Sequence, residues 1–188
     1  MNFLSRRQAV HKKRPAAFPS ILGVAAIIFG LDQVSKFLIL KHIPLGSSWD
    51  YLPGLARIFK LTFITNSGAA FGMFPQMGMA LMGIAAVVVV AITLFYHHLP
   101  IDNILVRISL GLQLGGAMGN LSDRIIHGYV VDFIDIGFWP IFNIADVSIV
   151  FGVSILAYIL WNEDNDLSNE NPADERRSTS LKKGATEP

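Results

Sequence analysis

The feature that most constrains this chain is a set of apolar runs, each about as long as a helix that crosses a lipid bilayer. Such a helix needs roughly 20 consecutive, mostly apolar residues. Four runs approach or meet that length, at residues 20–40, 77–96, 104–121 and 141–161. The whole chain is 52% hydrophobic and 15% charged, which is more apolar than a soluble domain of this size can bury. The pattern predicts a membrane protein with an all-α core, a four-helix transmembrane bundle.

The distribution of basic residues predicts how the bundle is oriented. Basic residues are dense before the first run and return in the C-terminal tail, and positive charge favours the cytoplasmic side. We therefore expect residues 1–19 to be a cytoplasmic basic segment, residues 20–162 to form the transmembrane domain, and residues 163–188 to be a disordered polar cytoplasmic tail. Both termini are then cytoplasmic, and the loops at 41–76 and 122–140 face outward.

The first outer loop carries a strand signal. Residues 58–65 are rich in aromatic and β-branched side chains with partial alternation, a pattern typical of a β-strand. We expect this loop to form a small extracytoplasmic β-sheet cradle lying on the membrane, together with a short surface helix.

Polar residues recur inside the apolar runs. An ionisable group in a bilayer costs about 2.5–3.5 kcal/mol, so it needs a partner or a function. When the chain is threaded through the membrane, these residues all fall in the outer half of their runs, which predicts one shared polar site. They are Asp32, Lys36, Asn120, Asp123, Arg124, Asn143 and Asp146.

Several of these residues have a structural interpretation. Asp32 and Lys36 lie one helical turn apart, where they either pair to let the helix insert or take part in chemistry directly. For Asp123 and Arg124, at the end of the third run, a structural role is favoured. Three neighbouring glycines are expected to permit close contact between helices: Gly115, Gly116 and Gly119.

Asp132 and Asp146 differ from the other acids because no basic residue lies within a turn of either and their flanks are apolar. Two carboxylates brought together in such surroundings would share a proton, one neutral and one ionised. An aspartic peptidase uses that arrangement: the ionised acid activates a water and the neutral acid polarises the scissile carbonyl. Spacing alone leaves this as one interpretation among several.

Other chemistries have less support in the sequence. Cysteine is absent, which excludes disulfides and thiolate chemistry, and no His-Glu-x-x-His motif exists, so we expect no metal. The alternative from another class is a small ion- or proton-coupled membrane transporter subunit. Transporter sites usually lie near the bilayer midplane between repeated halves, whereas these acids lie at one edge and no repeat is visible. A third interpretation is a scaffold whose polar residues only hold helices together.

Five segments in order resemble the motifs of one known family, the lipoprotein signal peptidases or signal peptidase II of bacterial inner membranes. They are DQVSK at 32–36, TNSGAAF at 65–71, GGAMGNLSDR at 115–124, VVDF at 130–133 and FNIAD at 142–146. The resemblance implies that Asp132 and Asp146 are the catalytic aspartates. It implies supporting or substrate-binding roles for Asn66, Asn120, Arg124 and Asn143, and structural roles for Asp32, Lys36 and Asp123. Asp135 receives no role from it.

The resemblance also implies a substrate and a location. The substrate would be a prolipoprotein whose cysteine already carries a diacylglyceryl group, cut just before that cysteine. The enzyme would be a multi-pass protein of the bacterial cell inner membrane, with its active site near the periplasmic face. Beyond the lipid-modified substrate and membrane lipids we expect no partner: no nucleic acid, no cofactor, and a monomer.

Overall fold

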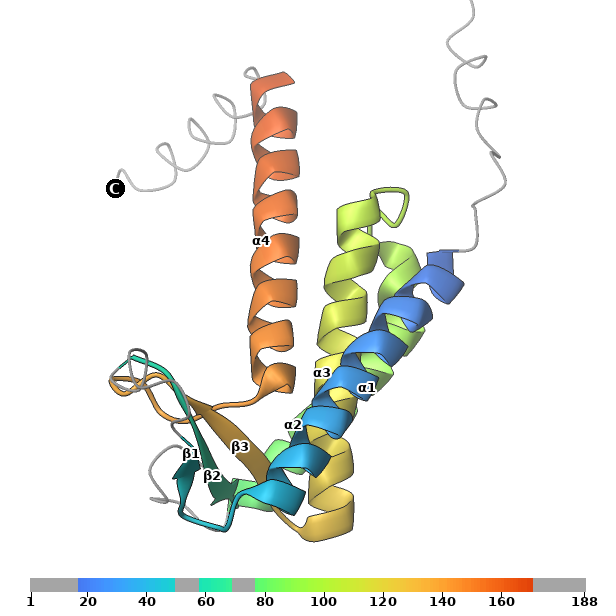
Figure 1. The fold of residues 1–188 in the computed structure, drawn as a ribbon. Coiled ribbons are helices and arrows are strands. Elements are labelled where there is room, and N and C mark those ends of the chain that lie inside the picture. Colours follow the sequence, from blue (N-terminus) through green and yellow to red (C-terminus); the bar gives the residue numbers. More distant parts are fainter. Residues whose placement is uncertain (1–16, 50–57, 69–76, 171–188) are drawn as a thin grey trace, which may run out of the picture.

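The computed structural model describes residues 17–49, 58–68 and 77–170. The helices are α1 (Ala17–His42), α2 (Met77–Phe95), the short 3₁₀ helix η2 (Tyr96–His98), α3 (Ile104–His127) and α4 (Ile144–Glu170). The strands are β1 (Ser48–Trp49), β2 (Lys60–Asn66) and β3 (Val130–Asp135). The sheet lies at the end of the molecule where α1 and α3 finish and α4 begins (Figure 1).

Helix α3 is the centre of the helical part, since it contacts α1, α2 and α4. Glycines allow this close approach. A Cβ atom on Gly115 would lie 2.6 Å from the carbonyl oxygen of Ala25 in α1, and one on Gly116 would lie 2.5 Å from that of Ala145 in α4. The glycine-rich stretch therefore packs against helices on two sides, as its sequence predicts.

In the part of the chain that the structure describes, three helices are long and apolar enough to cross a membrane: Phe18–His42, Ile104–His127 and Ile144–Asn162. Among the described residues α2 and η2 contribute a shorter apolar stretch, Met82–His98. Large apolar side chains such as Leu31 and Val34 of α1 remain exposed, which is typical of a surface that faces lipid. The prediction of a mostly helical membrane protein is confirmed at this level.

The sheet is antiparallel, in the order β1-β2-β3, with a bulge between Leu61 and Ile64. Strand β2 confirms the β-structure expected near residues 58–65, whereas β3 falls in a segment we expected to be a loop. Pairing with β2 over most of its length makes β3 a strand, because its backbone hydrogen bonds are satisfied there. The expected short surface helix is not found in the described residues, and residues 50–57 and 69–76 of the same loop lie outside them.

Two helices continue past their expected ends. Helix α3 extends to His127, where Gly128 at φ 80° provides its left-handed C-cap. Helix α4 extends to Glu170, so residues 163–170 are helical where we expected the disordered tail to begin. Polar residues prolong a helix that is already formed, since each one adds a backbone hydrogen bond without a new nucleus. Pro172, two residues further on, is unfavourable to a continuing helix.

Candidate active site

Asp132 and Asp146 come from different elements and meet at Asn143. Asp132 lies in β3 with 1% of its surface exposed, and Asp146 lies in the first turn of α4. The side-chain Nδ2 of Asn143 donates to Asp132 Oδ1 at 2.7 Å, and its backbone N–H donates to Asp146 Oδ2 at 3.2 Å. Both carboxyl groups are therefore within hydrogen-bonding distance of the same residue.

The start of α4 holds Asp146 in place. Asn143 directly precedes the helix, and its Oδ1 accepts from the backbone N–H of Asp146 at 3.0 Å while Asp146 Oδ2 accepts from the N–H of Asn143. This reciprocal pattern is a capping box, in which two backbone donors at the helix start are satisfied. The hydrogen bonds that begin α4 thus also orient its acid.

The alternation of β3 places Asp132 on the opposite face from its neighbours. Val131 and Phe133 pack against the C-terminal end of α1, and the side chain of Asp132 points the other way. There Asn66, at the end of β2, donates from Nδ2 to Asp132 Oδ2 at 2.8 Å. Each carboxylate oxygen of Asp132 therefore accepts a hydrogen bond from an amide.

Asn120 of α3 connects this pair of acids to a buried cation. Its Nδ2 donates to Asp146 Oδ1 at 2.8 Å. Its Oδ1 accepts from Asn143 Nδ2 at 3.1 Å and from Lys36 Nζ at 3.1 Å. The amide can satisfy all three partners in only one of its two orientations, because Nδ2 must face the acid and Oδ1 must face the two donors.

Lys36 lies in a buried cluster of charges behind the site. Its Nζ lies 2.8 Å from Asp32 Oδ2 and 2.9 Å from Asp123 Oδ2. Asp32 also accepts from the backbone N–H of Ala145 in α4, and Asp123 accepts from that of Val131 in β3. The cluster ties α1, α3, α4 and β3 together, which favours the structural interpretation of these three residues.

Gln33 belongs to the same cluster although the sequence argument did not select it. Its Nε2 contacts Asp32 Oδ2 at 3.1 Å, the carbonyl of Gly119 at 3.3 Å and Asp123 Oδ1 at 3.0 Å. A signal for it existed, because an uncharged amide next to Asp32 inside an apolar run also needs a partner.

The surroundings of Asp132 favour its protonated form. Burial raises its pKa, the negative charge of Asp146 raises it further, and hydrogen bonds from Asn66 and Asn143 together with the charge of Lys36 oppose the rise. The resulting pKa is about 7, against an ordinary value of 3.8. Asp132 can therefore carry a proton near neutral pH.

Arg124 lies beside the site without pairing with either acid. Its guanidinium donates from one terminal nitrogen to the backbone carbonyl of Asn120 at 3.3 Å. Its Nε is buried and has no hydrogen-bond partner within the described part of the chain. The residue as a whole is only partly buried, and its charge lies close enough to interact with both acids.

Every predicted site residue takes part in this network, and Asp135 lies apart from it. Lys60 Nζ lies 3.3 Å from Asp135, Thr62 donates to its Oδ2 at 2.9 Å, and the Gly137 N–H donates to its Oδ1 at 2.9 Å. Although burial acts in the other direction, these contacts hold the pKa of Asp135 below its ordinary value. Among residues 17–49, 58–68 and 77–170, no cluster of three or more metal-ligating side chains is found.

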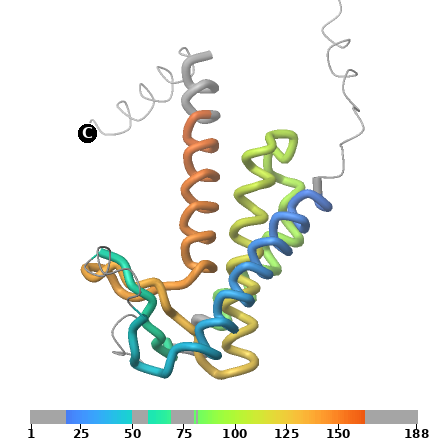
Figure 2. The backbone as a smooth tube through the Cα atoms, in the orientation of Figure 1, coloured from blue at the N-terminus to red at the C-terminus, as the bar shows by residue number. Residues whose placement is uncertain are grey.

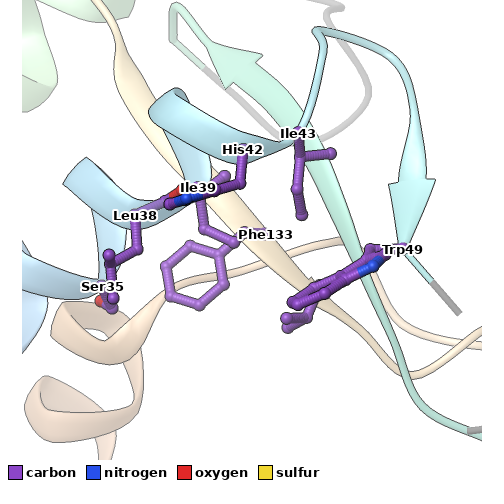
Figure 3. Close-up of a pocket in the computed structure, with 8 residues that line it drawn as sticks. Ser35, Leu38, Ile39, His42, Ile43, Trp49 and Phe133 are labelled. Carbon is purple, nitrogen blue, oxygen red and sulfur yellow. Dashed lines mark hydrogen bonds between the residues drawn. The ribbon is translucent and has the colours of Figure 1, made fainter. Parts of the chain in front are cut away.

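A cavity of about 350 Å³ lies on the other side of β3 from the acids. Its lining is almost entirely apolar and comes from the C-terminal end of α1 and the residue after it, from β1 and β2, and from Phe133 (Figure 3). Because Asp132 points away from Phe133 along the strand, this cavity is separate from the candidate active site.

Comparisons with known proteins agree with this geometry. A family model described as "Signal peptidase (SPase) II" matches residues 24–162. A lipoprotein signal peptidase of Moorella thermoacetica is 44% identical over 139 residues, covering 74% of this chain and 91% of that protein. One from Halothermothrix orenii is 39% identical over 141 residues, covering 75% of this chain and 94% of that protein.

A solved structure described as a bacterial membrane enzyme has a similar fold. Its TM-score is 0.70 with 31% sequence identity, covering 79% of this chain and 90% of that one. The relatives carry peptidase names, so the transporter alternative is not supported. The extent of the match confirms the resemblance seen in the motifs: the chain belongs to the signal peptidase II family.

Proposed function

We propose that this protein is an aspartic endopeptidase that removes the signal peptide from diacylglyceryl-modified prolipoproteins, with Asp132 and Asp146 as its catalytic pair. Membership of the family supports the reaction. The observation that carries the choice of residues is the convergence of both carboxyls on Asn143. Two acids at such close quarters, with the pKa of one raised, are arranged to divide the roles of general acid and general base.

In the proposed mechanism Asp132 is the acid and Asp146 the base. A water molecule gives a proton to Asp146 as its oxygen attacks the scissile carbonyl carbon, and Asp132 donates its proton to the carbonyl oxygen. The tetrahedral species collapses when the leaving nitrogen takes the proton from Asp146 and the carbon–nitrogen bond breaks. Asp132 then recovers a proton from the new carboxyl group. The pKa of about 7 supports the choice of Asp132 as the protonated partner.

The supporting residues act by orientation. Asn66, Asn120 and Asn143 offer neutral amide donors that fix both carboxyls without an ion pair. Arg124, a partly exposed cation beside the two acids, is proposed to hold a carbonyl of the substrate backbone. Asp32, Lys36 and Asp123 are proposed to keep the helices and β3 in register behind them.

The finer architecture follows from the same proposal. Helix α2 is the fourth span of the bundle, and the sheet is the cradle of the extracytoplasmic side. Both termini lie in the cytoplasm, residues 163–188 are a cytoplasmic tail, and the protein acts as a monomer in the bacterial inner membrane. The site then lies near the periplasmic face, where a lipid-bearing substrate brings its scissile bond to the acids and leaves its acyl chains in the bilayer.

A cleavage assay on purified protein tests the catalytic pair. Asp132→Asn and Asp146→Asn should each reduce kcat by at least about a thousandfold, since either change removes a proton carrier. Asp135→Asn is a matched control, because this acid lies in the same strand but bonds to Lys60, Thr62 and Gly137, and it should keep most of its activity. Substantial turnover by either dyad variant would contradict the assignment.

The substrate class is tested with a synthetic diacylated lipobox peptide and its unlipidated twin. Only the lipidated peptide should be cut efficiently, and addition of a chelator should leave the rate unchanged. Equal cleavage of both peptides would contradict the proposed requirement for a lipid on the substrate. Loss of activity with the chelator would mean that the reaction needs a metal.

A further inference from the structure

The edge of the sheet where β2 begins and β3 ends presents an exposed apolar surface that the proposed reaction does not use. We call Ile58, Phe59, Phe138 and Trp139 the aromatic tip. Phe138 is 83% exposed, Ile58 64% and Trp139 62%. Large apolar side chains gathered at such exposure indicate contact with something other than water.

The loop that carries Phe138 and Trp139 is held by backbone hydrogen bonds, so the exposure of these two side chains is not the result of a loose chain. The backbone N–H of Ile134 donates to the carbonyl of Phe142 at 2.7 Å, and the N–H of Phe142 donates back at 3.1 Å. Gly137 turns the chain at φ 81°, and its N–H is bound by the Asp135 carboxylate. The backbone therefore closes the loop between Ile134 and Phe142, while Phe138 and Trp139 in that loop stay exposed.

Within the described residues, the charges nearest to the tip pair with each other. Lys60 and Asp135 lie opposite each other at its base and pair at 3.3 Å. Beyond them, residues 136–142 read Ile-Gly-Phe-Trp-Pro-Ile-Phe and contain no ionisable side chain. An apolar loop without ionisable side chains enters a lipid headgroup region at low cost, and tryptophan is among the residues enriched in that region.

The tip also lies near the level at which α4 would enter the membrane. Figure 2 shows the loop that follows β3 level with the start of α4 and directed away from the helices. Trp139 is five residues before Ile144, where a candidate membrane span begins. Five residues cover at most about 18 Å, so the tip cannot lie far from the surface of the bilayer that α4 enters.

We propose that the aromatic tip is a membrane anchor, inserted among the lipid headgroups of the leaflet on the side of the sheet. Its partner is bilayer lipid, because the tip lies at the depth at which an adjoining helix enters the membrane. The anchor holds β3, and with it Asp132, at a fixed depth. This inference does not depend on the catalytic roles of the acids.

The absence of cysteine from the sequence makes a direct test simple, because a single introduced cysteine can carry a nitroxide label. Phe138→Cys is labelled in lipid vesicles beside two controls. Ser47→Cys lies in an exposed turn near β1, and Phe151→Cys lies on the apolar face of α4, where the native side chain is 61% exposed. Collision rates with oxygen and with a water-soluble nickel chelate measure the depth of each label.

The label at position 138 should show an oxygen-to-nickel ratio at least threefold above that at position 47 and below that at position 151. A ratio equal to that at position 47 would place the tip in water and overturn the proposal. Protection from both reagents would mean that protein covers the tip, either a second copy or another segment, and would overturn it as well.

Trp139 provides a second measurement that leaves the tip intact. In a Trp49→Phe, Trp161→Phe background it is the remaining tryptophan of the three in the sequence. Its fluorescence should be quenched by lipids brominated near the headgroup. Adding Phe138→Asp should reduce that quenching at least twofold while the circular dichroism spectrum stays unchanged. Quenching by aqueous iodide but not by brominated lipid, before that change, would refute insertion.

Discussion

At the scale of single residues, the two acids of the proposed dyad receive their hydrogen bonds from amide groups. Asn66 and Asn143 donate to Asp132 from their side chains. Asn120 donates to Asp146 from its side chain, and Asn143 donates to it from its backbone N–H. A neighbouring cation would favour ionisation of both acids far more strongly than an amide does. The amide environment orients the carboxyls and still lets one of them keep a proton.

This arrangement predicts a pH effect for Asn66→Leu. The hydrogen bond from Asn66 favours the ionised form of Asp132 and lowers its pKa, so its loss should raise that pKa above about 7. If protonated Asp132 is the acid, activity falls as pH rises through its pKa, and the alkaline limb of the rate profile should move to higher pH. The measurement is the pH dependence of kcat, with Ser67→Ala as the neighbouring control. A limb that stays in place or moves to lower pH would contradict the assigned proton.

The buried cluster around Lys36 predicts a large loss of stability. Lys36→Met leaves Asp32 and Asp123 without their cation, and breaking a buried pair in this way costs about 3–5 kcal/mol. Lys60→Met removes a partly exposed pair with Asp135 and should cost at most about 1 kcal/mol. The free energy of unfolding in mixed micelles measures both variants. Similar small losses would mean that the cluster contributes little to the fold.

At the scale of elements, the contact between α3 and α4 decides where Asp146 lies. Gly116 abuts the carbonyl of Ala145, the residue directly before that acid. The backbone of α4 therefore rests on α3 at the turn that carries Asp146, and any side chain at position 116 would push this turn outward.

Gly116→Ala should accordingly reduce both stability and activity. Its Cβ would come within 2.5 Å of a backbone oxygen that cannot rotate away. Gly23→Ala is the matched control in α1, because its Cβ would meet nothing within 4 Å, and it should be neutral or stabilise by up to about 1 kcal/mol. Melting temperature and cleavage rate should both fall for Gly116→Ala and not for Gly23→Ala. The same melting temperature and rate in the two variants would contradict the packing argument.

Elements with a long sequence pattern could be predicted, whereas an element with a short pattern was missed. Apolar runs of about 20 residues identify membrane helices, but hydrogen bonding and capping set their ends. These extended α3 to His127 and α4 into polar sequence. Strand β3 was missed, although Val130, Val131 and Phe133 around Asp132 are typical strand residues, because a six-residue run becomes a strand only when a partner pairs with it.

For the site, the sequence predicted which residues belong to it, but it did not predict most of the hydrogen bonds between them. Asn143 and Asp146 are three residues apart, so their capping box could have been read from spacing. The bridge from Asn143 to Asp132 and the contact of Asn120 with Asp146 join separate elements, and no local pattern indicates them. Gln33 was passed over because an uncharged side chain is a weaker signal than an acid.

At the scale of the whole molecule, α1 begins and α4 ends at the end opposite the sheet (Figure 1). Together with the basic residues near both termini, this supports the proposed orientation, with the sheet outside and the termini in the cytoplasm.

Single cysteines can test this orientation in intact cells. A membrane-impermeant maleimide should label Ser47→Cys, in the turn near β1, without permeabilisation. It should label Asp102→Cys, in the exposed turn before α3, only after the inner membrane is opened. The reverse pattern would invert the protein in the membrane, and labelling of both sites in sealed cells would contradict the four-span topology.

Asn143 both caps the start of α4 and donates a hydrogen bond to Asp132, and this limits which residues can replace it. Ser, Thr or Asp would start α4 about as well, but none carries an NH₂ group to reach Asp132 and Asn120. Gln carries that group but is not among the residues that start helices well. Asparagine is the one side chain that meets both demands, and it is fully buried, so no single substitution at position 143 should keep both the start of α4 and the hydrogen bond to Asp132.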